Sequence, residues 1–372
     1  MNGTFELTVS SLPRAQLFLF LETPPPVRAG VSNKRRTMRI PRLSVIIPTY
    51  NRSTLLVEAI RSVLAQSFTN FELIVIDDGS VDSTSQVVAA IKDERLRYLW
   101  LPHRGISAAL NNGLLHARGG YIARLDSDDL WLPNMLATLV SFLDSHPEIG
   151  VAYGKGQAID HQGRILTHTQ GLPERFPNDS LRSLLYEDCT CNIALVARRE
   201  CFEKAGPYDE TMLAHEDWDM WIRVARHYPF FFVDQLLAYI RWHDGNFTGI
   251  NSPHFETILT TRAAPLDKLF NDPELPQTVR TMKSQAYTNV FLYSGQRWMQ
   301  RRAWRRAAND FIQAVKTSDR PLVTATRVAW LSIATPLLKR TEAGRRAITA
   351  IAGFRRRLRE RPEQLVVRRQ NN

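Results

Sequence analysis

Short apolar runs alternate with amphipathic segments between residues 43 and 126. The first run, LSVIIPTYN, is aliphatic and β-branched and is closed by Pro and Asn, which is typical of a strand buried on both faces. In the next segment apolar side chains recur three and four residues apart, as on one face of a helix, with Ser53 as the expected cap. The pattern predicts strands at 43–51, 71–80, 96–101 and 120–126, and helices at 52–67, 81–93 and 105–117.

This alternation of strands and helices predicts an α/β fold, with an open, mostly parallel sheet and helices on both of its faces. In such sheets ligands gather at the carboxyl ends of the strands. Asp77 and Asp78 follow the second predicted strand, and Asp126 and Asp128 follow the fourth. We therefore expect these carboxylates at one edge of the sheet.

The pattern divides the chain into four parts. Residues 1–42 have no clear periodicity and contain a triple proline, which predicts a disordered N-terminal extension. Residues 43–250 form the α/β domain, whose later part is less regular, with a helix predicted at about 216–227 and one or two strands after it. Residues 251–340 are predicted to form a helical appendage, and residues 341–372 a basic tail.

Charge is distributed unevenly along the 372 residues, whose net charge is +11. Residues 295–372 carry 19 basic and 5 acidic side chains, whereas residues 1–294 carry 29 basic and 32 acidic ones. Because the body is close to neutral, its charge does not indicate a nucleic-acid binder. The three cysteines form no even framework and no zinc spacing, which favours a reducing, cytoplasmic setting. The chain has no apolar run of about 18 residues, so no membrane-spanning helix is predicted.

Three carboxylates stand within four positions in the segment DSDD at 126–129. Like charges this close need a cation, a proton or a positive partner. An Asp-x-Asp can offer one carboxylate to Mg2+ or Mn2+ and leave the other for a ribose or a water, while ligand phosphates complete the coordination. The alternative is that Asp126 or Ser127 caps a helix opening near Leu130, with Asp129 at its start. Spacing alone leaves both interpretations open.

Two further acidic segments allow a functional and a structural interpretation. The segment DDGS at 77–80 could accept hydrogen bonds from a nucleotide base or a ribose, or it could be an ordinary strand-to-helix turn. Glu216 and Asp217 open a predicted helix, where the helix dipole stabilises negative charge without any further role. One of them could instead be a general base beside Trp218 and Trp221, whose rings could stack on a sugar.

Taken together, these stretches resemble the family-2 glycosyltransferases, which are inverting enzymes of the GT-A fold that use nucleotide-diphospho-sugars. The resemblance covers about residues 43–250, and the ordered series is more specific than any single motif. The matching stretches are SVIIPTYNR at 44–52, SVLAQSFTNFELIVIDDGSVDST at 62–84, GISAALNNGL at 105–114, GGYIARLDSDDLWLPNML at 119–136 and HEDWDMWIR at 215–223.

For the nucleotide, the resemblance implies that Asp78 recognises the base. Pro48, Tyr50 and Asn51 would line the same pocket, and Arg104 would lie in the next loop that contacts the nucleotide. The donor expected from the resemblance is a nucleotide-diphospho-sugar.

For the chemistry, the resemblance implies that Asp126 and Asp128 are the Asp-x-Asp pair. Asp126 would lie on the nucleotide side, and Asp128 would be the main ligand of Mn2+ or Mg2+. Asp217 resembles the catalytic base and is paired with Glu216. His243 stands where some members have a histidine near the metal or the diphosphate; a histidine after a strand is otherwise a structural residue.

The implied reaction is a direct displacement with inversion. The base takes the proton of an acceptor hydroxyl as its oxygen attacks the anomeric carbon, and the metal neutralises the departing nucleoside diphosphate. We expect a metal-dependent transferase of surface polysaccharide or glycolipid biosynthesis, with a glycan or a lipid-linked acceptor. The family's processive synthases carry Gln-x-x-Arg-Trp and membrane spans, and their absence here favours the addition of a single sugar.

Two other functions stay open at this stage. One is a catalytically inactive scaffold that binds a sugar nucleotide or a membrane. The other is a nucleotidyltransferase, which would need a glycine-rich basic loop after the first strand, and PTYNRSTLL offers none.

The C-terminal basic region, residues 320–372, joins an amphipathic apolar segment to dense arginine. It could lie on an anionic membrane surface, which would suit a lipid-linked acceptor and a peripheral location on the inner face of the cell membrane. The alternative is a helix packed on the catalytic domain, followed by a solvated tail. No nucleic-acid partner is expected, because the region contains no recognisable binding module.

Overall fold

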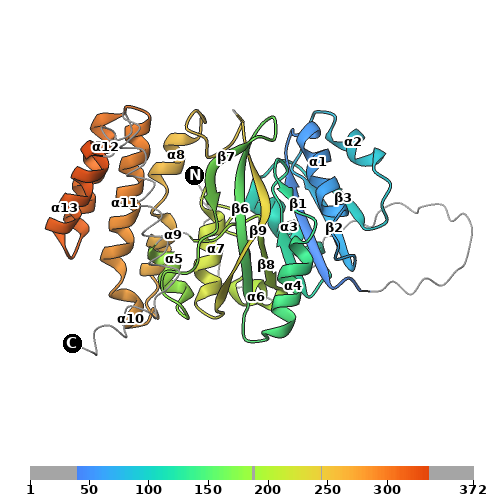
Figure 1. Cartoon of the computed structure of the whole chain (residues 1–372), viewed down its shortest axis with the longest axis horizontal. Helices are drawn as coiled ribbons and strands as arrows, with labels where there is room; N and C mark the ends of the chain where they lie inside the picture. The colour runs from blue at the N-terminus through green and yellow to red at the C-terminus, as the bar shows by residue number, and fades with distance from the viewer. Residues whose placement is uncertain (1–39, 187–188, 244, 335–372) are drawn as a thin grey trace, which may run out of the picture. The chain divides into compact units, whose positions relative to one another are not determined.

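The computed structural model describes residues 40–186, 189–243 and 245–334. Most of the predicted N-terminal extension and the whole basic tail lie outside the described residues. Figure 1 shows the described chain as a central sheet with helices on both faces, followed by a group of helices from the C-terminal part of the chain.

The described strands form one sheet in the order β3-β2-β1-β4-β8-β6-β9-β5, and β7 pairs with β6. The strands β1 to β4 are parallel, as the sequence predicts, and Thr49 at the end of β1 lies opposite Asp77 at the end of β2. Beyond β4 the sheet contains both antiparallel and parallel pairs. The strands are β1 Leu43–Thr49, β2 Phe71–Asp77, β3 Leu96–Trp100, β4 Tyr121–Arg124, β5 Leu130–Trp131, β6 Val151–Asp160, β7 Ile165–Gln170, β8 Leu195–Arg198 and β9 Phe230–Trp242.

Successive residues of β1 face two separate cores, because side chains alternate along a strand. Val45 and Ile47 pack in the core that includes α1 and α4, whereas Ile46 packs in the core that includes α3 and α7. Both faces of β1 and β2 are therefore completely buried, in agreement with their mainly apolar sequences. The helices of this part are α1 Ser53–Leu64, α2 Thr84–Ala90, α3 Ile106–His116, α4 Met135–Ser145, α5 Ser180–Tyr186, α6 Arg199–Ala205 and α7 Glu216–Ala225.

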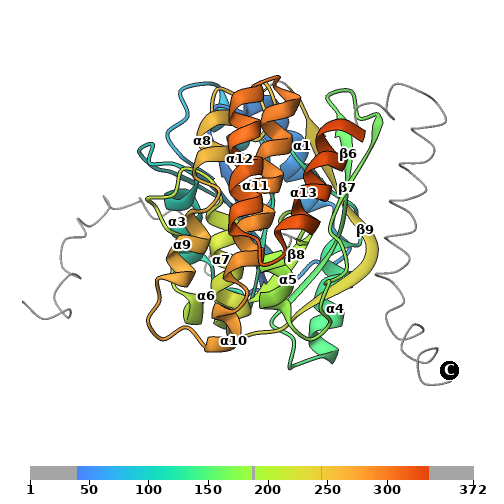
Figure 2. The same ribbon diagram turned by 90° about the vertical axis from the view of Figure 1, so that its left-hand side faces the viewer.

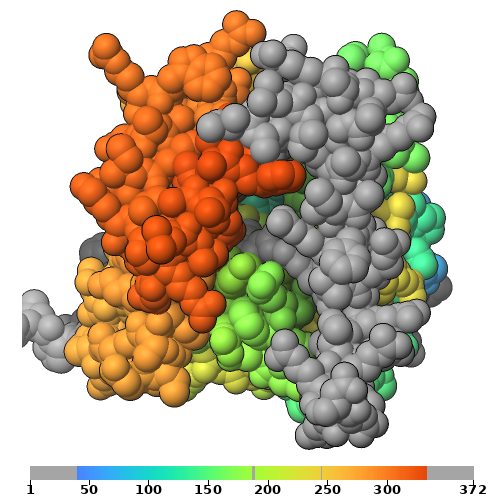
Figure 3. Space-filling view, turned by 60° about the vertical axis from the view of Figure 1, so that its left-hand side comes forward, coloured from blue at the N-terminus to red at the C-terminus, as the bar shows by residue number. Residues whose placement is uncertain are grey.

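The predicted C-terminal helical appendage is present and has a small core of its own. Figure 2 shows α11 and α12 side by side, and Phe255, Trp298 and Phe311 pack between α8, α11 and α12. Figure 3 shows the same helices as a continuous orange and red surface. Among the described residues no helix is both long and apolar enough to cross a bilayer. The helices are α8 Phe255–Thr260, α9 Ala264–Phe270, α10 Gln277–Arg280, α11 Lys283–Gln300, α12 Trp304–Thr317 and α13 Pro321–Ala329, which continues into a π-helical turn at Trp330–Ala334.

Two local predictions are wrong. No helix opens near Leu130, because Leu130–Trp131 forms the short strand β5 on β9, and α4 begins only at Met135. Ser53 does not cap α1 through its side chain; its backbone N–H donates to the carboxylate of Asp82, 3.1 Å away in the loop after β2. In both cases the deciding partner lies on a distant segment.

Candidate active site

The carboxylate of Asp78 organises the loop that precedes α3. Asp78 follows β2, and its backbone N–H donates to the carbonyl of Thr49 at the end of β1. Its two carboxylate oxygens accept the backbone N–H groups of Arg104 and Gly105, at 2.8 and 2.9 Å, and His103 Nδ1 lies 2.8 Å away. Because the buried carboxylate of Asp78 binds two backbone N–H groups of this loop, it fixes the shape of this side of the site.

Tyr50 and His103 form an aromatic wall beside this loop. Their rings are stacked, with centroids 4.2 Å apart and planes 19° apart, and Tyr50 is half exposed. Asn51, at a positive φ of 50°, connects the first two loops: its N–H donates to Ser80 Oγ at 2.8 Å, and its Oδ1 accepts the N–H of Val81 at 2.9 Å. His103 was not among the residues predicted from the sequence.

The remaining residues predicted for the nucleotide side lie differently. Pro48 is buried inside β1, in register with Ile76. The guanidinium of Arg104 pairs with Glu210 at 2.6 Å, and Asn111 donates to the same carboxylate at 3.0 Å. The backbone of Arg104 thus meets Asp78 while its side chain reaches across to the loop before α7.

Arg124, the last residue of β4, joins two of the acidic segments. Its Nε donates to Asp126 at 2.8 Å, and its Nη1 lies 3.2 Å from Glu216 at the start of α7. The arginine and Glu216 are buried, whereas Asp126 is about one-third exposed. A charge this deep needs a paired partner, and Arg124 has two.

Asp128 is buried next to two positive or ionisable groups. Arg52 forms an ion pair with its Oδ2, and His243 Nε2 lies 3.0 Å from the same oxygen. Arg52 also donates to the carbonyl of Gly245, at 3.2 Å. Burial alone would raise the pKa of Asp128, but the hydrogen bond with His243 and the charge of Arg52 outweigh it and lower that pKa.

Asp129 does not begin a helix, which corrects the structural role expected for it. Its Oδ1 accepts the backbone N–H of Arg241 on β9, at 2.8 Å. Burial and the negative charges of Asp128 and Asp126 raise the pKa of Asp129 well above its usual value. Asp129 is therefore the member of the cluster that most readily holds a proton, and it ties the segment to β9.

Asp217 stands in the first turn of α7 and is partly buried. Its Oδ2 accepts a hydrogen bond from Asn192 Nδ2 at 2.6 Å, and its Oδ1 accepts the N–H of Trp218 at 2.7 Å. Trp221 Nε1 donates to Asn192 Oδ1 at 2.7 Å, which fixes the orientation of the amide. Trp218 and Trp221 are both buried, so neither offers an open ring face to a sugar.

Glu216 differs from its neighbour because it is buried. Its burial and the negative charge of Asp217 raise the pKa of Glu216 to about 7, although Arg124 opposes this. The residue before it, His215, adopts the left-handed conformation at a φ of 66°, and its Nε2 lies 2.7 Å from the carbonyl of Ile258 on α8. The C-terminal helices thus contact the start of α7.

The profile of glycosyl transferase family 2 matches residues 44–204. The chain is 30% identical over 193 residues to Escherichia coli WcaA, which is named "Putative colanic acid biosynthesis glycosyl transferase"; the match covers 50% of this chain and 67% of WcaA. The chain belongs to glycosyl transferase family 2.

Other relatives extend beyond the shared segment. An uncharacterized glycosyltransferase of Rickettsia conorii is 32% identical over 206 residues, which are 54% of this chain and 34% of the relative. The chain therefore matches about a third of the length of that relative.

Solved structures of low sequence identity share the fold. Staphylococcus aureus TarS 1-349 in complex with UDP-GlcNAc superposes with a TM-score of 0.58 at 19% identity, over 79% of this chain and 84% of that one. A mannosyltransferase of Pyrobaculum calidifontis in complex with GDP-Man and Mn2+ gives 0.53 at 19% identity, over 88% and 89%. The predicted GT-A fold, with helices at the C-terminus, is confirmed.

Of the three predicted metal ligands of this family-2 chain, Asp128 and His243 are placed to share a divalent cation, whereas Asp126 is not. Among the described residues no group of three or more His, Cys, Asp or Glu side chains could hold an ion. Asp128 Oδ2 and His243 Nε2 lie together, however, and both could bind one ion whose other positions are filled by diphosphate oxygens and waters. Asp126 is turned toward Arg124 instead.

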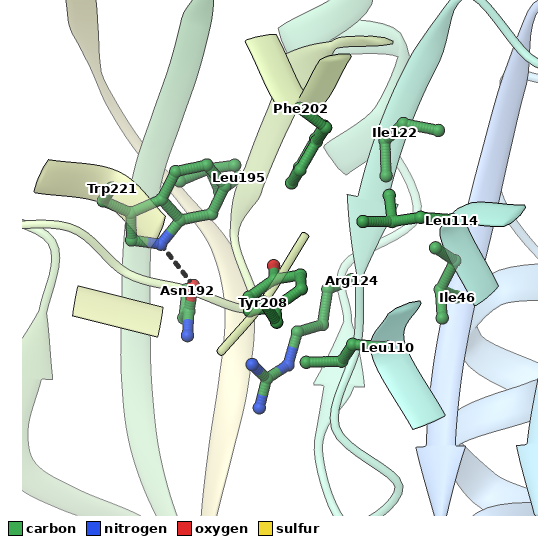
Figure 4. A pocket seen from close by; sticks show the side chains of 10 residues that line it. All are labelled: Ile46, Leu110, Leu114, Ile122, Arg124, Asn192, Leu195, Phe202, Tyr208 and Trp221. Carbon is green, nitrogen blue, oxygen red and sulfur yellow. Dashed lines mark hydrogen bonds between the residues drawn. The ribbon is translucent and has the colours of Figure 1, made fainter. Parts of the chain in front are cut away.

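A small pocket lies behind the acidic residues, and Figure 4 shows Arg124 and Asn192 at its edge. Apolar side chains from β1, β4, β8 and the helices α3, α6 and α7 enclose most of it. Both polar side chains have a carboxylate partner outside the pocket, Arg124 with Asp126 and Asn192 with Asp217. The pocket therefore marks the layer of residues that holds the acidic groups in place.

Four residues of this arrangement were missed by sequence reasoning: Arg52, His103, Arg124 and Asn192. Only Arg124 left a signal, since it is the single charged residue in the apolar run YIARL and would need a partner when buried. Asp128, the partner of Arg52, lies 76 residues away along the chain, and Glu216, the second partner of Arg124, lies 92 residues away.

Proposed function

We propose that the protein transfers a sugar from a nucleotide-diphospho-sugar to an acceptor hydroxyl, with inversion at the anomeric carbon. One observation carries the proposal: Arg124 bridges Asp126 and Glu216, so the Asp-x-Asp segment and the acidic pair belong to one cluster at the end of β4. Membership of glycosyl transferase family 2 supports the same reaction class.

In the proposed reaction Asp217 is the general base. Asn192 and the N–H of Trp218 each occupy one lone pair of its carboxylate, and a carboxylate can accept further hydrogen bonds, including one from an acceptor hydroxyl. Glu216 is held by Arg124 at the end of β4, and it would position the start of α7 rather than take the proton. A positioned base accelerates such a proton transfer by about 10²–10⁴-fold.

Asp128 and His243 would hold Mn2+ or Mg2+, and the ion would neutralise charge on the leaving nucleoside diphosphate. An imidazole among the ligands favours Mn2+, because Mg2+ prefers oxygen ligands. Arg52 pairs with Asp128 in the structure and is long enough to turn toward a diphosphate instead. We propose that Arg52 leaves Asp128 and pairs with a phosphate group of the donor when donor and metal bind.

The nucleotide would lie against the loops after β1 and β2. The stacked pair Tyr50–His103 offers an aromatic face for a base, and the buried Asp78 keeps the neighbouring loop in shape. In this proposal Asp78 either holds that loop in the shape that fits the base, or contacts the base directly through a carboxylate oxygen that also accepts a backbone N–H of the loop. Arg104 would contact the donor after leaving Glu210.

We propose a cytoplasmic enzyme that builds a surface polysaccharide or a glycolipid on a glycan or lipid-linked acceptor. The colanic acid assignment in the name of WcaA supports a polysaccharide product. The donors in the titles of the two solved neighbours, UDP-GlcNAc and GDP-Man, define the first nucleotide sugars to assay.

The test is metal-dependent release of nucleoside diphosphate from UDP- and GDP-sugars, by the wild-type chain and by Asp217→Asn. We expect the variant to lose about 10²–10⁴-fold in kcat while it still binds UDP or GDP with Mn2+ in calorimetry. Asp272→Asn, which alters a surface carboxylate paired with Arg226, should keep full activity. An Asp217→Asn enzyme with normal turnover would exclude Asp217 as the base, and nucleotide binding by the wild type without turnover of any donor would favour a scaffold.

A further inference from the structure

The turn between α11 and α12 carries a cluster of arginines around an exposed tryptophan. We call Arg301, Arg302, Trp304 and Arg305 the arginine–tryptophan tip. All four are exposed, and Trp304 keeps 60% of its surface in solvent. In Figures 1 and 2 the turn lies at the same end of the described chain as α8, and α10 lies at the opposite end.

The positive charge of the tip is balanced only in part, because Glu256 is the acidic group near Arg301 and it already pairs with Arg306. The next arginine along the chain, Arg306, is neutralised by Glu256 at 2.6 Å. Arg301 lies over the ring of Phe255, 4.6 Å from its centroid, and none of the three tip arginines forms an ion pair with an acidic side chain of the described chain. These charges also surround the start of α12, where the helix dipole disfavours cations. Apart from the contact of Arg301 with Phe255, the described residues give the charges of the tip no ion pair that would stabilise the hairpin.

We propose that the arginine–tryptophan tip binds the surface of a membrane that contains anionic lipids. Arginines attract acidic headgroups, and tryptophan prefers the boundary between headgroups and acyl chains, where its ring is buried and its N–H stays hydrated. The tip combines both in four exposed residues of one turn. It lies within the described chain and is distinct from the basic tail, which starts at residue 341.

Charge decides among the occupants of the tip. The C-terminal tail of the same chain is itself strongly basic and would be repelled by the three arginines. A nucleic acid would suit the charge, but residues 1–294 are close to neutral and add no excess of basic side chains along which a long polyanion could continue. A flat anionic surface needs only the projecting turn, and a lipid headgroup layer provides it.

The helix that leads into the tip also contacts the segment after β9. Arg297, on the last turn of α11, donates to the carbonyl of Thr248 at 3.0 Å, and Thr248 lies five residues after His243, which directly follows β9. A membrane bound at the tip would hold this side of the site near the headgroups, where a lipid-linked acceptor would be presented. This consequence rests on the proposed function, whereas the binding itself does not.

The test is sedimentation of the full-length chain with vesicles of phosphatidylglycerol and phosphatidylcholine, beside vesicles of phosphatidylcholine alone. We expect binding only to the anionic vesicles and its loss at high salt. Replacing Arg301, Arg302 and Arg305 together by Gln should weaken binding by about a hundredfold, at about fivefold for each charge. Trp304→Ala should weaken it further, because the ring no longer enters the interface.

Three matched variants decide the position of the contact. Replacement of Arg61, Arg182 and Lys204 by Gln removes the same charge from other exposed sites, and Trp100→Ala removes a similarly exposed tryptophan; both should bind as the wild type does. Replacement of Arg355, Arg356 and Arg357 by Gln tests the tail. The proposal is overturned by unchanged binding of the tip variant, by an equal loss in the matched variants, or by loss in the tail variant alone.

A separate readout distinguishes this proposal from the proposed function. Release of nucleoside diphosphate without vesicles should be the same in the tip variants and the wild type, since no tip residue belongs to the candidate site. A chain that binds vesicles through the tip but turns over no donor keeps this inference and removes the proposed function. A chain that turns over donors but does not bind anionic vesicles keeps the proposed function and removes this inference.

Discussion

The two sides of the candidate site hold their carboxylates in different ways. On the nucleotide side, Asp78 accepts two backbone N–H groups of one loop, so its partners move only if the loop moves. On the metal side, Asp128 is paired with the side chains of Arg52 and His243, which can rotate away without changing the backbone. The first arrangement is built into the fold, and the second is exchangeable.

This difference suits the ligands that each side is proposed to bind. A nucleotide base needs a preformed wall, because ordering a loop during binding would reduce the affinity. A metal and a diphosphate bring their own charges, so the carboxylate needs a temporary positive partner until they arrive. The predictions below test whether the side-chain contacts are indeed exchangeable, and which of them is not.

The largest effect is expected at Arg124, the one side-chain partner that cannot be exchanged. Arg124→Met leaves Glu216 buried without a cation and should reduce the free energy of unfolding by about 3–5 kcal/mol at alkaline pH, where Glu216 is ionised, measured by urea denaturation. Adding Glu216→Gln to the same chain removes the orphaned charge and should restore part of that loss. A loss below about 1 kcal/mol in the single variant would show that the pair is open to solvent.

A smaller effect is expected from pH. Burial and the charge of Asp217 raise the pKa of Glu216 to about 7 in the folded chain, above its ordinary value of 4.5. Because the folded state then binds the proton more tightly than the unfolded state, this residue stabilises the fold below about pH 4.5 and loses that contribution as the pH rises to about 7. The change should be about 3 kcal/mol.

Glu216→Gln is the control for this pH dependence. Since glutamine does not titrate, the difference in unfolding free energy between wild type and variant should fall between pH 4.5 and 7 and stay constant above. A difference that is independent of pH would mean that Glu216 is ionised throughout this range and that Arg124 dominates its environment.

The sequence predicted the sheet better than it predicted the site. Uninterrupted apolar runs such as LSVIIPT specify strands buried on both faces, and their order specifies the parallel half of the sheet. The acidic strand ends were found because a charge next to an apolar run is conspicuous. Arg52 and Asn192 were missed, because each is an ordinary polar residue until folding brings Asp128 or Asp217 beside it.

The same reason explains the errors around residue 130. A helix was expected there because local capping residues precede an apolar stretch, and local signals are all that a sequence displays directly. In the structure Leu130 pairs with Tyr239 of β9, more than 100 residues away, and Asp129 accepts the N–H of Arg241. A long-range strand pairing overrode the local preference.

The smallest effect, and the most direct test of exchangeability, is expected at Arg52. Arg52→Ala removes the cation that pairs with Asp128, so the nucleotide-free chain should bind Mn2+ about fivefold more tightly in calorimetry, equivalent to about 1 kcal/mol for a partly exposed pair. The same variant should bind UDP or GDP more weakly, because it lacks the arginine proposed to meet the diphosphate. Arg61→Ala, an exposed arginine on α1, controls for net charge.

Asp78→Asn supplies the opposite result from the backbone-held side. An asparagine keeps one oxygen but turns an N–H donor toward one of the two backbone N–H groups that Asp78 accepts, so the loop before α3 should lose its order. Nucleotide affinity should then fall while Mn2+ affinity without nucleotide stays unchanged. If Arg52→Ala instead left Mn2+ affinity the same or reduced it, the arginine would be a fixed part of the site, and the contrast between the two sides would fail at its central residue.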